Sequence, residues 1–322
     1  MNKIKLLLLA LFLLINQNVY SWGFLAHRYI NRHAVYLLPE PMISFYKKHI
    51  EYIAEHAIDP DKRGQVVEDE AVRHYFDADV YGKNPFEVMP RKWKDAVAKY
   101  TEDTLQTYGI LPWNINWYFS KLVKAFKDKD VDRILYISAS LGHYIGDATV
   151  PLHCTEYYDG KEPAQKGIHA FWETRMIELF VSDFNFFIGK AEYVKNPLTT
   201  AWQLVENSHY AVDTIFSAEI SLRKTFPSDK KYIVIRKYGE NKAQITKEYA
   251  IAFDKLTNKM VERKLCIATQ FVASFWYSAW VNAGQPDLTS IENEKVSEKQ
   301  AQKTKELEEE FQKVFIGEDP IR

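Results

Sequence analysis

Three side chains of the kinds that bind metal ions lie in the segment from Leu141 to His153, which reads LGHYIGDATVPLH. His143 and Asp147 stand four residues apart in a helical pattern, so both side chains leave one face of the helix and can share an ion. Pro151 lacks a backbone N–H and disturbs the helix about one turn earlier, which lets His153 point toward a different position. The segment therefore predicts part of a metal centre.

A second pair of metal-binding residue types follows in HAFWE, where His169 and Glu173 again stand four residues apart. One such pair alone is more often a hydrogen-bonded structural pair than a metal site. Two pairs with His153 between them, in a chain with only two cysteines, favour a metal centre built from imidazole and carboxylate groups.

Upstream, RHYFDAD places His74 ahead of an acidic turn, and HAIDPDK places Asp59 fifteen residues before that histidine. We expect Asp59 to be a ligand, with Asp61 as the competing candidate two residues later.

The first 21 residues have the pattern of a secretory signal peptide. Lys3 and Lys5 precede ten apolar residues, and Val19 and Ser21 occupy the −3 and −1 positions of a cleavage site. The alternative, a retained membrane anchor, is disfavoured because the apolar run is well short of the roughly 20 residues that span a bilayer. We expect a secreted or periplasmic protein with no stable membrane span.

Cleavage after Ser21 would leave Trp22 as the first residue, in the segment WGFLAH that ends at His27. A free α-amino group has a pKa of roughly 8, so it can lose its proton to a metal near neutral pH. The amino nitrogen and carbonyl oxygen of Trp22 are therefore candidate ligands.

Taken in order, WGFLAH, Asp59, HYFDAD, HYIGDATVPLH and HAFWE resemble the superfamily of zinc-dependent phospholipases C and single-strand-specific zinc nucleases. The resemblance runs from Trp22 to about Glu173. Its most specific part is HYIGD-x3-PLH, and the other pieces are specific through their order.

The resemblance implies an all-helical fold and a site of three zinc ions. The first ion would be held by Asp59, His74, His143 and Asp147, and the second by His153, His169 and Glu173. The third would be held by Trp22, His27 and Asp147, so that Asp147 bridges two ions. Water between zinc ions becomes hydroxide near neutral pH, and Asp59 is a candidate to accept its proton.

Two branches of this superfamily leave different marks on the sequence. The five-residue step from Trp22 to His27 resembles the nucleases, which act on single-stranded nucleic acid. Glu173 is closer to phospholipase C. So are the fifteen residues between His153 and His169, which lack the paired-glycine-and-asparagine motif of the nucleases. We expect a phospholipid substrate, with single-stranded nucleic acid as the alternative and a zinc-binding protein without turnover as a third hypothesis. No protein partner is identifiable.

Helices must position these residues, because helical periodicity dominates the chain. It covers Ile43–Ile53, Trp113–Phe126, Ile134–Ile145, Phe171–Phe180, Ala201–Phe216 and a long stretch from Leu256 to Trp276. The only persuasive strand is Tyr232–Lys237, YIVIRK, with one arm of a local ribbon as its expected place. We predict one all-α domain over residues 22–286.

The tail over residues 287–322 is rich in charge and is predicted to be a helix docked by a narrow apolar stripe, Leu307, Phe311, Val314 and Phe315. A partner-binding helix is the alternative.

Composition sets outer limits on the protein. With 322 residues, 47% hydrophobic and 26% charged, the chain is neither disordered nor collagen-like. A net charge of −1 gives no overall basic field for nucleic acid or membranes. Cys154 and Cys266 can form one disulfide or remain buried thiols.

Overall fold

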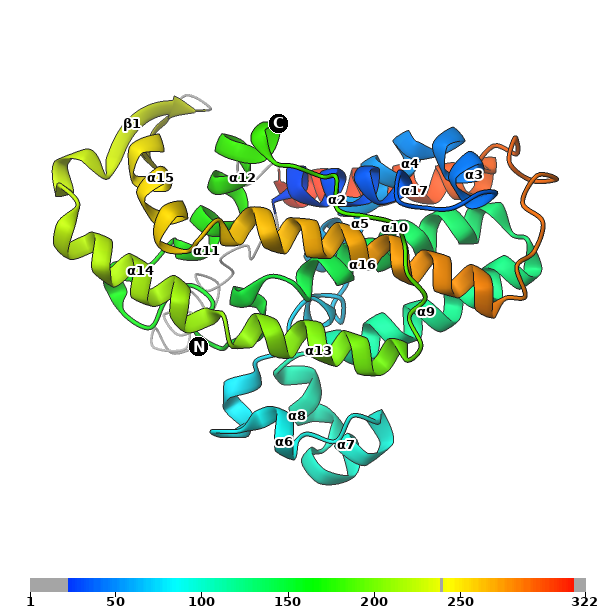
Figure 1. The fold of residues 1–322 in the computed structure, drawn as a ribbon, viewed down its shortest axis with the longest axis horizontal. Helices are drawn as coiled ribbons and strands as arrows, with labels where there is room; N and C mark the ends of the chain where they lie inside the picture. The colour runs from blue at the N-terminus through cyan, green and yellow to red at the C-terminus, as the bar shows by residue number, and fades with distance from the viewer. Residues whose placement is uncertain (1–22, 238–239, 316–322) are drawn as a thin grey trace, which may run out of the picture.

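The computed structural model describes residues 23–237 and 240–315, so the predicted signal peptide and Trp22 lie outside the described residues. The predicted all-α fold is confirmed, since the described elements are helices apart from one two-stranded sheet (Figure 1). The α-helices are α2 (Phe24–Val35), α3 (Met42–Lys48), α4 (Ile50–Glu55), α5 (Asp59–Val66), α6 (Pro85–Val88), α7 (Trp93–Tyr100), α8 (Glu102–Thr107), α9 (Leu111–Asp128), α10 (Val131–Asp147), α11 (Ile168–Ala170), α12 (Met176–Phe180), α13 (Pro197–His209), α14 (Val212–Thr225), α15 (Lys247–Leu256), α16 (Met260–Asn282) and α17 (Glu298–Phe315).

The centre of the fold is α10, which packs against α9, α16 and α2 (Figure 1). Helix α9 ends at Asp128 and is followed by Lys129, whose φ of 53° lies in the left-handed region. Asp130 then caps α10 by accepting from the Arg133 N–H at 3.0 Å. Helix α10 is buried along nearly its whole length, which explains why most of its residues after Arg133 are apolar or small.

Two glycines of α10 let helix α2 approach closely. A Cβ at Gly142 would lie 2.0 Å from the Asn31 Oδ1 atom, and a Cβ at Gly146 would lie 3.1 Å from the His27 ring. The amide of Asn31 instead donates to the carbonyls of Ile53 and Ala139, at 3.2 and 3.1 Å. This close packing holds the face of α2 that carries His27 against α10.

Several of the predicted periodic stretches contain breaks that periodicity alone does not reveal. Ile43–Ile53 is divided at His49 into α3 and α4, and Ala201–Phe216 is divided after His209 into α13 and α14. The long stretch starting at Leu256 begins as a helix only at Met260, because Asn258 and Lys259 both have a φ of 52°. The apolar pattern continues across these breaks because both arms face the same core.

The sheet is the antiparallel hairpin of β1 (Tyr232–Lys237) and β2 (Glu240–Ile245), with Tyr232 opposite Ile245. The prediction of a strand at Tyr232–Lys237 is confirmed. A ribbon partner was expected, but its residues were not identified, because ENKAQI lacks an alternating apolar pattern.

The charged tail forms α17, which lies along α5. Phe311 is buried, its ring centroid is 6.2 Å from that of Phe24, and Glu308 pairs with Lys62 at 2.7 Å. Val314 is 48% exposed, so the docking stripe is narrower than predicted.

Two further sequence expectations have outcomes in the structure. Cys154 and Cys266 are both free thiols. None of the described helices combines the length and apolar character needed to cross a bilayer.

Candidate metal centre

Eight imidazole and carboxylate side chains come together in the interior, on segments far apart in the sequence. All are buried, with His74 the most exposed at 8%. They are His27, Asp61, His74, His143, Asp147, His153, His169 and Glu173. They form three groups in which the candidate ligand atoms lie within 4.8 Å of one another.

The first group joins His74 to the pair on α10. Nε2 of His143 lies 3.2 Å from Oδ2 of Asp147, as their spacing of one helical turn predicts. Nδ1 of His74 lies 3.0 Å from the same oxygen and 3.0 Å from Nε2 of His143. Three of the four ligands expected for the first ion are therefore together.

The second group is the expected set of His153, His169 and Glu173. Oε2 of Glu173 lies 3.1 Å from Nε2 of His169 and 3.4 Å from Nε2 of His153. Glu173 belongs to a short π-helical segment, Phe171–Arg175, which replaces the uniform helix predicted there. Such wide turns are frequent at functional sites.

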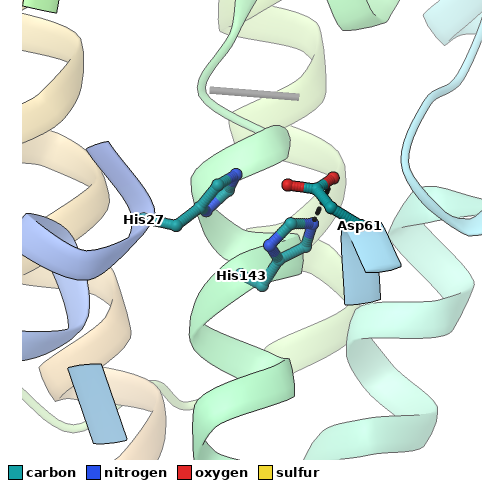
Figure 2. Close-up of side chains that lie close together, drawn as sticks. All are labelled: His27, Asp61 and His143. Carbon is teal, nitrogen blue, oxygen red and sulfur yellow. Dashed lines mark ion pairs between the residues drawn. The ribbon is translucent and has the colours of Figure 1, made fainter. Parts of the chain in front are cut away.

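The third group brings His27 of α2 and Asp61 of α5 to His143 (Figure 2). Oδ1 of Asp61 lies 3.5 Å from Nε2 of His143, and the His27 ring stacks on the His143 ring with centroids 3.8 Å apart. His27 is also 3.5 Å from Asp147, through Nε2 and Oδ1. His27 is thus close to Asp147, with which it is predicted to share the third ion.

The structure brings Asp61, the competing candidate, to the cluster in place of the expected Asp59. Side chains two positions apart on a helix point in directions that differ by about 200°, so only one of these two carboxylates can face the cluster. Asp61 does so, whereas Oδ2 of Asp59 lies 2.8 Å from Nδ1 of His56 and Oδ1 lies 3.6 Å from Nζ of Lys62. No group that could hold an ion within the described ranges includes Asp59.

The predicted ligand Trp22 precedes the described residues, but its neighbour Gly23 is placed. The Gly23 N–H donates to the Glu173 carbonyl at 3.2 Å, and a Cβ at Gly23 would lie 2.6 Å from Oγ1 of Thr174. The chain entering α2 therefore runs directly against the segment that supplies Glu173.

Backbone carbonyls fix the orientation and tautomer of two histidines. Nδ1 of His143 donates to the Ala57 carbonyl at 2.8 Å, and Nδ1 of His153 donates to the His74 carbonyl at 2.9 Å. A carbonyl only accepts, so each Nδ1 carries the proton and each Nε2 presents a lone pair to the cluster. Since His143 has one such lone pair, the two groups that share it cannot both bind an ion through it.

The donor set fits divalent cations that prefer nitrogen and oxygen ligands. Several cluster atoms are buried and have no hydrogen-bond partner among the described residues, namely Oδ2 of Asp61, Oε2 of Glu173 and Nε2 of His74, His153 and His169. Leaving such atoms unsatisfied is costly, and a bound cation satisfies both the lone pairs and the negative charge. The several buried groups can thus hold metal ions.

Burial and neighbouring charges set the protonation of the cluster. Burial lowers the pKa of His169 to about 4, so its ring is neutral and ready to bind metal at pH 7. Burial raises the pKa of Glu173 to about 7. Although burial opposes ionisation of Asp147, the charges and hydrogen bonds of His143 and His74 hold its pKa well below the usual range.

A buried polar network beside the cluster was not predicted from the sequence. Glu70 accepts hydrogen bonds from Tyr144, from Arg63 Nε at 3.1 Å and from Arg73 at 2.6 Å. The Tyr144 ring packs edge-on against His74, with centroids 5.3 Å apart. Arg63 and Glu70 carry no spacing signal, so only the fold reveals that they support this histidine.

No family model matches the chain. A protein of Bradyrhizobium tropiciagri named as a probable serine protease is 22% identical over a match of 202 residues that covers 56% of this chain. The chain spans only 24% of that protein's length.

Proposed function

We propose that this protein is a secreted or periplasmic zinc-dependent hydrolase of phosphodiester bonds that resembles phospholipase C. Its site would hold three zinc ions, and the chain would belong to the superfamily of zinc phospholipases C and single-strand-specific zinc nucleases. Hydrolysis of single-stranded nucleic acid is the alternative. The five-residue spacing from Trp22 to His27, which resembles that of the nucleases, supports it.

The observation that supports the proposal best is the convergence of the buried ligand groups around Asp147. Oδ2 of Asp147 lies 3.0 Å from His74 and 3.2 Å from His143, while Oδ1 lies 3.5 Å from His27 and 3.7 Å from His153. A carboxylate with two oxygens facing different imidazoles is suited to bridge two ions.

Each residue of the cluster has a role in this proposal. His74, His143 and Asp147 would hold one ion with Asp61, while His153, His169 and Glu173 would hold another. His27 and Asp147 would hold a third together with the amino end of Trp22. Bound zinc supplies an electrophile for the phosphate oxygens and lowers the pKa of a coordinated water.

Groups of the chain itself orient the ligands and accept the proton of the attacking water in this proposal. The carbonyls of Ala57 and His74 keep His143 and His153 turned toward the cluster. The proton-accepting role expected of Asp59 passes to Asp61 in this proposal, because Asp61 faces the cluster and its Oδ2 has no hydrogen-bond partner among the described residues.

A serine nucleophile, as the name of the Bradyrhizobium protein would suggest, has less support here. Ser138, Ser140 and Ser208 are buried in helices near the cluster. The hydroxyls of Ser138 and Ser140 hydrogen-bond Tyr46 and Arg63, and that of Ser208 donates to the Ala148 carbonyl and accepts from Lys264 at 3.0 Å. None of these partners is a histidine, so these three serines form no serine–histidine pair. That relative shares with the proposal only the broad class of hydrolase.

The test is hydrolysis by the correctly processed protein, reconstituted with zinc. It is incubated separately with phosphatidylcholine, single-stranded DNA and casein, with and without a chelator. We expect release of phosphocholine that the chelator abolishes. Nucleotide release alone would favour the nuclease alternative, whereas cleavage of casein alone or full zinc content without turnover would refute the proposal.

A matched pair of histidine variants controls for folding. His169→Gln removes a cluster ligand and is expected to lower kcat/KM at least about 100-fold. His33→Gln changes a half-buried histidine of α2 whose Nδ1 bonds the Tyr29 carbonyl outside the cluster, so its activity should stay close to that of the unmodified protein.

A further inference from the structure

The β1–β2 hairpin exposes apolar side chains on both of its faces. Tyr232, Ile233 and Val234 are 47%, 46% and 71% exposed. Successive residues of a strand point to opposite faces, so Ile233 leaves one face and its two neighbours leave the other. Figure 1 shows β1 at the edge of the molecule, above α15. Contiguous exposed apolar groups of this kind mark interaction surfaces.

Positive charge is concentrated in the same segment. Residues 230–247 contain six lysines and arginines and one acidic residue, Glu240, in a chain whose net charge is −1. Lys230 and Arg236 are exposed, whereas Nζ of Lys231 lies 3.4 Å from the buried Glu219. The exposed aliphatic groups therefore lie among cations, and a partner must satisfy both.

The hairpin is attached directly to the segment that carries two cluster residues. Nε of Arg175, two residues after Glu173, donates to the carbonyl of Ile245 at 3.3 Å. At the start of α15, Tyr249 packs edge-on against Phe171, with ring centroids 5.8 Å apart. A partner bound by the hairpin is thus held on the side of the molecule that supplies His169 and Glu173.

We propose that the β1–β2 hairpin docks the protein on an anionic lipid bilayer. Anionic headgroups would neutralise Lys230 and Arg236. With β1 entering edge first, the acyl boundary would take up Ile233 on one face of the hairpin and Val234 on the other. A nucleic acid backbone would satisfy the cations but leave these aliphatic side chains against phosphate and sugar. The idea that docking brings lipid substrate to the cluster rests on the proposed function. Docking itself can be measured without any turnover of lipid.

The expected size of the effect follows from the charge. Each lysine or arginine near an anionic membrane surface strengthens partitioning roughly fivefold, so removing two should weaken it about 25-fold. The effect should shrink as salt is added, because the surface potential is screened within a Debye length.

The test is co-sedimentation of the full processed chain with vesicles of phosphatidylcholine alone or mixed with phosphatidylglycerol. The lipid is checked by thin-layer chromatography after each run, so that binding is scored on intact lipid. We expect binding to the mixed vesicles to exceed binding to phosphatidylcholine alone. Equal binding to both, or to neither, would overturn the proposal.

Two double variants separate the charge from the apolar groups. Lys230→Gln with Arg236→Gln should weaken binding to mixed vesicles about 25-fold. Ile233→Thr with Val234→Thr keeps β-branched residues in the strand and should weaken binding at least about fivefold. Unchanged binding by both would overturn the proposal, provided that circular dichroism shows an intact fold.

The matched controls lie on other elements. Lys94→Gln with Lys127→Gln removes two exposed charges from α7 and α9, and Val88→Thr changes a 42% exposed valine of α6. Both should bind mixed vesicles like the unmodified protein, and an equal loss in these controls would overturn the assignment to the hairpin.

Other partners and the proposed function are distinguishable in the same experiments. Capture of single-stranded DNA, or dimerisation by light scattering, that is lost in the hairpin variants without any effect on vesicle binding would overturn the proposal. Vesicle binding through the hairpin without hydrolysis of any phosphodiester would support docking while refuting the proposed function.

Discussion

The placement of Asp61 rather than Asp59 at the cluster can be tested by comparing two conservative substitutions two residues apart. Oδ1 of Asp61 lies 3.5 Å from Nε2 of His143 and 3.8 Å from Nδ1 of His74, so a cation shared with these rings would be next to its charge. Asp59 is equally buried but pairs with His56 and Lys62 instead. Only Asp61→Asn should therefore weaken metal binding.

The magnitude follows from the charge removed. Unit charges about 4 Å apart interact by about 4 kcal/mol at an effective dielectric constant of 20. An amide oxygen recovers part of this, so we expect Asp61→Asn to lose about 3 kcal/mol, or roughly 150-fold, in zinc affinity at one site. Asp59→Asn should change zinc affinity less than about threefold and cost about 1 kcal/mol of folding stability through the lost His56 contact.

The thermal stability of the metal-free protein provides a second measurement, in which Asp61→Asn should be favourable rather than harmful. Burial raises the pKa of Asp61 well above its usual range, with the charge of Asp147 adding to the shift. Stability is then greatest below the unfolded pKa of about 4 and is lost as the pH rises through the raised folded pKa. Asn cannot ionise, so metal-free Asp61→Asn should unfold at or above the temperature of the unmodified protein at pH 7.

The assay is competition with a chromophoric zinc chelator, followed by thermal unfolding of the metal-free proteins. Weaker zinc binding in Asp61→Asn without loss of fold is the expected result. The reasoning is refuted if Asp59→Asn loses zinc while Asp61→Asn retains it, or if both variants bind zinc like the unmodified protein.

Three further predictions follow from single features of the site and its surroundings. Replacing Asp147 with Asn should weaken two zinc positions together in metal analysis, and loss of one alone would show that this carboxylate does not bridge. An extra residue ahead of Trp22 removes the free amine from its expected place, so it should lower the zinc content by about one ion, and unchanged stoichiometry would contradict the N-terminal assignment. Burial, with the charges of Asp79 and Glu156, raises the pKa of Asp77 to about 7, so its ionisation destabilises the fold progressively between about pH 4 and pH 7. Asp77→Asn should therefore be more stable than the unmodified protein by about 1–2 kcal/mol at pH 8, a gain that shrinks as the pH falls toward 4, and thermal unfolding across that range would show whether it does.

Local spacing predicted the parts of the site that lie on one element. The i, i+4 pairs His143 with Asp147 and His169 with Glu173 are adjacent in the structure because a helical turn brings such residues together. His153 was expected to point to a different position, and it does so through its bond to the His74 carbonyl.

The sequence pattern did not predict how helix α5 is rotated about its own axis, and therefore which of its side chains face the cluster. Asp59 and Asp61 are both acidic and both lie in the first turn of α5, so their types and spacing do not distinguish them. The packing of α5 against α10 decides which carboxylate faces His143. The same limit applied to Arg63 and Glu70, whose contacts with Tyr144 exist only once α10 is in place.

Fold class followed from periodicity, whereas the breaks within it did not. Positive φ angles at Asn258 and Lys259, and the π-helical segment at Phe171–Arg175, leave the apolar repeat nearly unchanged. The strand β2 was missed because it is recognisable only by its pairing with β1.

The docking of α17 on α5 bears on the order in which the molecule can be completed during synthesis. Phe311 packs against Phe24, and Glu308 pairs with Lys62, so residues synthesised later in the chain cover residues synthesised much earlier. A nascent chain that has not yet reached Glu298 leaves this side of α5 open to water and to chaperones. Synthesis of α17 is then the event that covers the helix bearing Asp61.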